Sequence, residues 1–142
     1  MPNINEIILI LEGFQYDTSF YLNMECFHIQ LIEDVSNLCT IILPWVKYHY
    51  TCLPMGVNNS PYIFQQNLNN LFHIFYFICA YIDDLLILTK VYWTYHVGKL
   101  ELTVNKMEER GLKFDIEGSF FRKIQIEYLG FWVTCDAVKP LY

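Results

Sequence analysis

The chain has 142 residues and a formal net charge of −6 at pH 7, with 54% hydrophobic and 17% charged residues. This length suits one domain or part of one, and the composition is more apolar than that of most soluble domains. We therefore expect exposed apolar surface that larger neighbours would cover. The net negative charge argues against a self-sufficient nucleic-acid-binding protein, because such proteins normally present a basic surface.

The first half of the chain predicts a short helix, a strand, a hairpin and a long helix, over residues 4–12, 18–24, 37–53 and 60–74. Gly13 suits the end of the short helix. The hairpin has its turn at Pro44-Trp45-Val46. Ser60 and Pro61 suit the cap and the first position of the long helix.

The second half predicts a hairpin around Asp83 and Asp84, because a short apolar run precedes the pair and another follows it. A second long helix covers roughly residues 92–110 and ends before Gly111. We expect its buried face to include Val97, Leu100, Val104 and Met107. The tail returns to strand, most clearly over residues 126–134.

The fold class that this order predicts is α+β. Strands interleaved with two helices favour an antiparallel sheet with both helices packed on one face, a ferredoxin-like β-α-β-β-α-β core. Asp83 and Asp84 would then lie on the open face or the rim of the sheet, where a long polymer could lie across them.

The cysteines and histidines show neither disulfide nor metal-site spacing. The five cysteines are scattered, with no Cys-x-x-Cys pair, which is typical of free, buried thiols in a reducing compartment. The chain starts without the basic leader of a signal peptide, and its longest apolar stretch, residues 71–82, is shorter than the roughly 20 residues of a membrane span. We expect an intracellular protein of the cytoplasm or nucleus, without a membrane segment.

Asp83 and Asp84 are the strongest candidates for chemistry. Two carboxylates held by rigid strands suit Mg²⁺, which prefers hard oxygen ligands in a strict octahedron. The alternative is an Asp-Asp turn chosen only because aspartate tolerates turn geometry.

Five sequence boxes, in order, resemble the palm region of reverse transcriptases from gypsy-like long-terminal-repeat retrotransposons. Tyr81-Ile82-Asp83-Asp84 looks like the Tyr-x-Asp-Asp box of that family. The other boxes are Asn37 to Pro44, Leu53 to Val57 with Asn59-Ser60-Pro61 and Phe64-Gln65, Gly111-Leu112-Lys113, and Tyr128-Leu129-Gly130-Phe131. The resemblance covers nearly the whole chain and implies that residues 1–142 are one partial reverse transcriptase domain, a polymerase palm with part of the fingers.

This resemblance implies RNA-directed DNA synthesis, in which deoxynucleotides are added to a primer by two Mg²⁺ ions. The partners it implies are an RNA or DNA template-primer, a deoxynucleoside triphosphate and the remaining domains of a longer polyprotein. The implied metal-binding and catalytic residues are Asp83 and Asp84. The implied nucleotide or template contacts are Met55, Gly56, Gln65, Tyr81, Cys26 and Phe27, and the implied primer grip is Tyr128, Leu129 and Gly130.

Several of these residues have a structural alternative. Tyr81 and Met55 would then be ordinary apolar packing residues. Gln65 would lie on a solvated helix face. Leu129 and Gly130 would be structural, with Gly130 allowing a close backbone approach.

One departure from the family pattern bears on catalysis. The family carries a third metal-binding aspartate on the first strand, and Tyr21 occupies that position here. A neutral phenol is a poor Mg²⁺ ligand. Asp17 shares the strand face but lies about 13 Å away along a strand, while Asn23 is uncharged, and we expect neither to replace the aspartate.

The charges expected around the site also argue for impaired catalysis. The segment after Lys113, residues 114–118, is acidic where the family usually has a basic residue in a loop, and Glu25 follows the first strand. Carboxylates there would repel a triphosphate. The basic fingers, thumb, ribonuclease H and integrase parts lie outside the sequence, so the chain resembles a truncated, catalytically impaired polymerase with weak Mg²⁺ binding. The alternatives are a non-catalytic interaction or nucleic-acid-binding remnant and a sequence with no selected activity.

Overall fold

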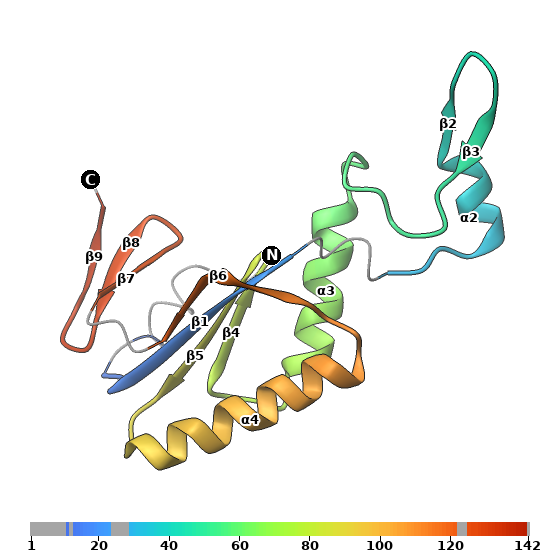
Figure 1. The fold of residues 1–142 in the computed structure, drawn as a ribbon. Coiled ribbons are helices and arrows are strands. Elements are labelled where there is room, and N and C mark those ends of the chain that lie inside the picture. Colours follow the sequence, from blue (N-terminus) through green and yellow to red (C-terminus); the bar gives the residue numbers. More distant parts are fainter. Residues whose placement is uncertain (1–10, 12, 24–28, 122–124, 142) are drawn as a thin grey trace.

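The computed structural model describes residues 11, 13–23, 29–121 and 125–141 (Figure 1). The helix predicted over residues 4–12 lies outside these residues, apart from Leu11. Gly13 has a left-handed backbone, with φ of 73°.

The central element is an antiparallel sheet of four strands in the order β4-β5-β1-β6. Its strands are β1 (Tyr16–Leu22), β4 (Ile78–Tyr81), β5 (Asp84–Thr89) and β6 (Phe114–Phe121). Two long helices, α3 (Ser60–Phe72) and α4 (Trp93–Glu109), connect them in the order β1, α3, β4, β5, α4, β6. This is the α+β arrangement that the sequence predicts.

Both helices cover the same face of the sheet (Figure 1), as predicted. Every residue of β5 after Asp84 is buried, which is typical of a central strand. Leu85 and Ile87 face the helices and pack with Phe64, Leu68 and Met107. The prediction that Val97 is buried is wrong, because its side chain is 42% exposed. His96 and Thr103 are buried on α4 instead.

The other face of the sheet is covered as well, by a second sheet of three short strands in the order β7-β8-β9. These strands are β7 (Gln125–Tyr128), β8 (Phe131–Thr134) and β9 (Val138–Pro140). The expected single strand over residues 126–134 is therefore wrong: the chain reverses at Leu129 and Gly130, whose φ angles are 51° and 80°. Since Ile126, Tyr128 and Val133 pack against Leu86 and Leu88, this face of the sheet is not open along β5.

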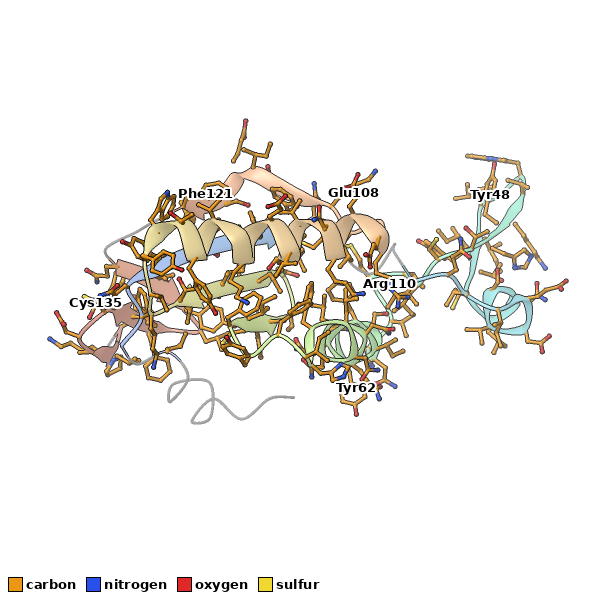
Figure 2. The ribbon with its side chains drawn as sticks, turned by 90° about the horizontal axis from the view of Figure 1, so that it is seen from below. Tyr48, Tyr62, Glu108, Arg110, Phe121 and Cys135 are labelled. Carbon is orange, nitrogen blue, oxygen red and sulfur yellow. The ribbon has the colours of Figure 1, made fainter. Side chains whose placement is uncertain are left out.

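The segment before α3 forms an arm that projects from the sheet (Figure 1). It consists of α2 (Glu33–Leu38), β2 (Thr40–Ile42) and β3 (Lys47–His49). The predicted hairpin is confirmed, with Thr40 opposite His49. Its strands are shorter than expected, because Asn37 and Leu38 belong to a helix that the sequence analysis missed. Tyr48 marks this arm in Figure 2.

Two local predictions need correction. Ser60 is not a helix cap: it is the first residue of α3, fully buried, and its hydroxyl donates to the carbonyl oxygen of Pro54 at 2.6 Å. Residues 114–118 are not a loop but the first part of β6, where the register with β1 shifts between Ser19 and Tyr21. No helix in the described part of the chain combines the length and the apolar character that a membrane span needs.

Candidate active site

Asp83 and Asp84 lie at the turn of the β4–β5 hairpin, as the sequence predicts. Tyr81 pairs with Asp84, so Ile82 and Asp83 are the two central residues of the turn. Ile82 has a φ of 47°, although a β-branched side chain rarely adopts the left-handed region. Such strain is maintained only where surrounding contacts enforce it.

Two contacts from other elements hold this turn. The backbone amide of Leu22, at the end of β1, donates to the carbonyl oxygen of Asp83 at 2.6 Å. The backbone amide of Ile82 donates to Oε1 of Gln65, from α3, at 2.7 Å. The turn is thus bonded to the end of β1 on one side and to α3 on the other.

Asp84 lies on the face of the sheet away from the helices, in line with Leu86 and Leu88. Burial raises the pKa of Asp84, and the neighbouring charge of Asp83 raises it further. Both effects favour the protonated acid over the carboxylate. A cation at the turn would have the opposite effect, because it stabilises the charged form.

Tyr21 stands directly beside Asp84. The two residues are opposite each other in the β1–β5 ladder, so their side chains project from the same face. On its other side Tyr21 is opposite Asp115 of β6. Tyr21 thus lies in a row across three strands, between Asp84 and Asp115.

Gly118 of β6 leaves room for Tyr21. A Cβ atom at position 118 would lie 3.1 Å from Cβ and 3.2 Å from Cγ of Tyr21. Ser119 supports the same residue, because its hydroxyl oxygen accepts from the Tyr21 amide at 3.2 Å while its hydroxyl group donates to the Asp115 carbonyl. Sequence reasoning missed Gly118 and Ser119 because it treated residues 114–118 as a loop.

No group of three or more His, Cys, Asp or Glu side chains that could hold a metal ion occurs among the described residues. Asp17 is buried and pairs with Leu88, near the far end of β5 from the turn. Asp17 therefore lies at the opposite end of β5 from Asp83 and Asp84. Glu25 lies outside the described residues.

The predicted primer-grip residues are the last residue of β7 and the two turn residues of the β7–β8 hairpin, which packs on the Asp84 face. Tyr128 lies against Cys79 and Tyr81, and its hydroxyl is buried without a hydrogen-bond partner in the described part of the chain. Burial, followed by Cys79 and Asp84, raises the pKa of Tyr128. Gly130 does not allow a close backbone approach, since a Cβ there would meet nothing within 4 Å; its positive φ is what the turn requires.

The remaining predicted contacts have different surroundings. Met55 is 54% exposed and Gly56 has open space around it, so both lie on the surface in the turn before α3. Gln65 is not on a solvated helix face: it is 2% exposed, and both atoms of its amide bond to groups of this chain rather than being presented to a template. Cys26 and Phe27 lie outside the described residues.

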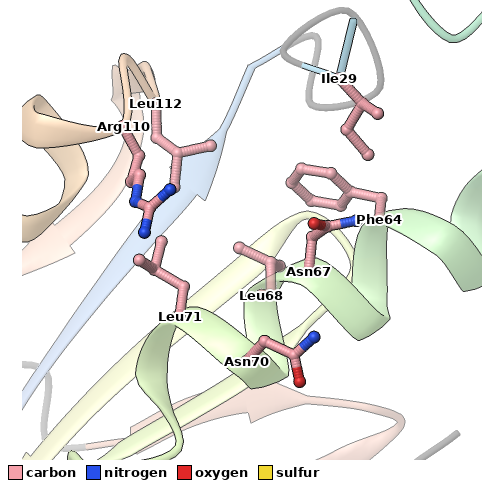
Figure 3. Close-up of a pocket in the computed structure, with 8 residues that line it drawn as sticks. All are labelled: Ile29, Phe64, Asn67, Leu68, Asn70, Leu71, Arg110 and Leu112. Carbon is pink, nitrogen blue, oxygen red and sulfur yellow. The ribbon is translucent and has the colours of Figure 1, made fainter. Parts of the chain in front are cut away.

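A pocket of about 290 Å³ lies elsewhere, between α3 and the segment after α4 (Figure 3). In Figure 3 Arg110 and Leu112 face Leu68 and Leu71 across it. None of the predicted site residues lines this pocket. The candidate active site is therefore the surface at the hairpin turn and not this cavity.

Comparison with known proteins identifies the family of this chain. The family described as reverse transcriptase (RNA-dependent DNA polymerase) matches residues 14–133. Among curated relatives, the retrovirus-related Pol polyprotein from transposon opus of Drosophila melanogaster is 31% identical over 98% of this chain and 14% of its own length. The corresponding polyprotein from transposon 297 of the same organism is 28% identical over 99% of this chain and 13% of its own length. The chain thus spans a small part of these relatives.

Solved structures share the fold. The foamy viral protease-reverse transcriptase in complex with RNA/DNA hybrid superposes with a TM-score of 0.81, at 21% identity, over 91% of this chain and 17% of that one. The same protein in complex with double-stranded DNA gives a TM-score of 0.83 at 20% identity, over 99% of this chain and 30% of that one.

Proposed function

This chain belongs to the reverse transcriptase family, and from that premise we propose that it is the palm, with part of the fingers, of a gypsy-like retrotransposon polymerase that adds deoxynucleotides to a primer on an RNA template. We further propose that its catalysis is impaired. The Drosophila relatives and the order of the sequence boxes support the first part. Tyr21 beside Asp84 supports the second.

The described residues fit one Mg²⁺ ion better than two. Mg²⁺ is usually held by one or two carboxylates together with water and substrate phosphates. Asp83 and Asp84 can supply the carboxylates at the half-buried turn of the hairpin. A bound ion there would lower the pKa of the primer 3′-hydroxyl and neutralise phosphate charge. A second ion about 3.5–4 Å away needs a further carboxylate, and Tyr21 stands in its place.

The chain's own groups have separate roles in this proposal. Asp83 and Asp84 hold the cation as carboxylates, and burial and the charge of Asp83, which raise the pKa of Asp84, oppose that ionised form. Tyr81 and Leu129 pack against the apolar cluster on the Asp84 face of the sheet, which supports a primer end bound near the β7–β8 turn of Leu129 and Gly130. Met55 and Gly56 are free to contact a template or nucleotide from the turn before α3.

The proposal is tested by primer extension on an RNA template with Mg²⁺ or Mn²⁺. This palm and its Tyr21→Asp variant are each grafted into the reverse transcriptase of a gypsy-like relative, so that fingers and thumb are present. We expect extension from the Tyr21→Asp graft, at least a hundredfold above the Tyr21 graft, and none after a further Asp83→Asn change. Equal extension by both grafts would contradict the impairment. Silence of both would contradict the polymerase site and favour a non-catalytic interaction protein.

A further inference from the structure

Gln65 bonds directly to the turn that carries Asp83 and Asp84. Its side chain is 2% exposed and donates from Nε2 to the carbonyl oxygen of Ala80 at 2.9 Å. Its Oε1 accepts from the amide of Ile82 at 2.7 Å. One side chain of α3 thus binds the last part of β4 and the first residue of the turn.

The amide of Gln65 is itself oriented. The second Nε2 proton is directed to Oδ1 of Asn69, one turn further along α3, at 2.8 Å. Because the nitrogen has two acceptors and the oxygen has a donor, the amide has only one orientation that satisfies all three bonds. A buried amide with every partner in place acts as a rigid contact.

The bond to Ile82 has a particular consequence. Ile82 is a β-branched residue with a φ of 47°, and such a residue adopts this conformation only where surrounding contacts enforce it. The Gln65 acceptor is one such contact, because it satisfies the Ile82 amide in that conformation. Asp83 follows directly, so the direction of its carboxylate depends on the conformation that Gln65 supports.

We propose that Gln65 is a positioning residue for the Asp83–Asp84 pair: it holds Ile82 in the left-handed conformation and thereby sets the carboxylates for a cation. The metal-binding part of this inference rests on the proposed function. The conformational part does not, since it concerns only contacts within the chain. Gln65 acts through the turn and has no contact with a reacting group.

The test compares three variants of this chain with the unaltered chain by amide hydrogen exchange at Ile82. Gln65→Met fills a similar volume but removes all three hydrogen bonds, and Gln65→Glu keeps an acceptor oxygen for Ile82. Gln66→Met is the matched control, because Gln66 is the next residue of α3 and is exposed. We expect Ile82 to exchange at least tenfold faster in Gln65→Met, to stay closer to the unaltered rate in Gln65→Glu, and to be unchanged in Gln66→Met, while Ile87 keeps its protection.

If Gln65 only fills space, the Ile82 exchange rate of Gln65→Met should be closer to that of the unaltered chain than the rate of Gln65→Glu is. That result would overturn the proposal. If Gln65→Met does not fold, loss of Ile82 protection in a folded Gln65→Glu would equally overturn it, because the acceptor is still present there.

The second measurement uses Mn²⁺ as the probe, through the paramagnetic broadening of the Asp83 and Asp84 amide signals. We expect the Mn²⁺ concentration for half-maximal broadening to rise at least threefold in Gln65→Met and to stay unchanged in Gln66→Met. Equal values in the two variants would overturn the positioning role. Absence of broadening in the unaltered chain would instead count against the proposed metal site, while the exchange rates would still decide what Gln65 does to the turn.

Discussion

Tyr21 and Gly118 touch each other across two neighbouring strands of the main sheet. The closest approach, 3.1 Å from the Tyr21 Cβ to a Cβ placed on Gly118, leaves almost no room for a side chain at position 118. Aromatic residues commonly cover glycine across a strand pair in this way. The neighbouring strand therefore leaves room for the tyrosine at position 21, and we expect positions 21 and 118 to be coupled in stability.

A double-mutant cycle measures that coupling. Gly118→Ala should lower the free energy of unfolding by about 1 kcal/mol when residue 21 is tyrosine, because the added methyl group meets the base of its side chain. In a Tyr21→Ala background the loss should be smaller by about 0.5–1 kcal/mol, since the ring is gone. The measurement is equilibrium denaturation of the four proteins.

Gly98→Ala is the control for the methyl group itself. Gly98 is in α4 and a Cβ there meets nothing within 4 Å, so alanine should raise the free energy of unfolding by about 0.5–1 kcal/mol. A Gly118→Ala effect of that same sign and size would show that the contact with Tyr21 does not limit position 118.

At the scale of elements, the strong patterns were predictable and the short ones were not. The periodic apolar faces of α3 and α4 and the apolar runs around Asp83 and Asp84 each continue for several residues, so their type follows from the sequence. Residues 126–134 read as one strand because Leu129 is apolar, yet the Leu129-Gly130 turn reverses the chain. The position of β6 beside Tyr21 depends on pairing between distant segments, which no local pattern reports.

His96 shows how tertiary contacts give a residue a role that its sequence position does not indicate. It is fully buried in α4, and its two ring nitrogens contact hydroxyl groups of β1 and β5: Nε2 lies 2.9 Å from Oγ1 of Thr18, and Nδ1 lies 2.8 Å from Oγ1 of Thr89. The rings of Tyr16 and Trp93 complete its surroundings. The neutral imidazole of His96 therefore links α4 to β1 and β5.

This contact predicts a pH dependence of stability. Burial lowers the pKa of His96 from 6.5 to about 4, so the unfolded chain binds the proton more tightly than the folded chain does. The free energy of unfolding should therefore fall as pH decreases from about 6.5 to about 4, by on the order of 3 kcal/mol. Asp84 has the opposite sign, because its raised pKa gives stability that is lost as pH rises.

The pH dependence of the free energy of unfolding that we assign to His96 is isolated by comparing variants that all retain Asp84. His96→Gln should lose the decrease between pH 6.5 and 4, whereas His73→Gln should keep it, because His73 is exposed at the end of α3. The measurement is chemical denaturation at a series of pH values. An identical slope in the two variants would assign the decrease to other groups.

For the whole molecule, the sequence predicted both the α+β palm fold and an excess of exposed apolar surface. The fold follows because five boxes in the correct order constrain the whole chain, and the surface follows from composition. Composition does not say where that surface lies, however. The structure shows much of it on the projecting arm, where Leu38, Ile42 and Trp45 are 84%, 70% and 78% exposed.

Such a concentration of apolar side chains on one projecting element should make the chain associate with itself. Replacing the three residues together (Leu38→Ser, Ile42→Thr, Trp45→Ser) should weaken self-association at least tenfold in sedimentation experiments. The free energy of unfolding should change by less than about 1 kcal/mol, because exposed side chains contribute little to the core. Tyr62→Ser tests the location, since Tyr62 is 53% exposed on α3, outside the arm. If that single change weakened association as much as the triple change, association would depend on exposed apolar side chains in general and not on the arm.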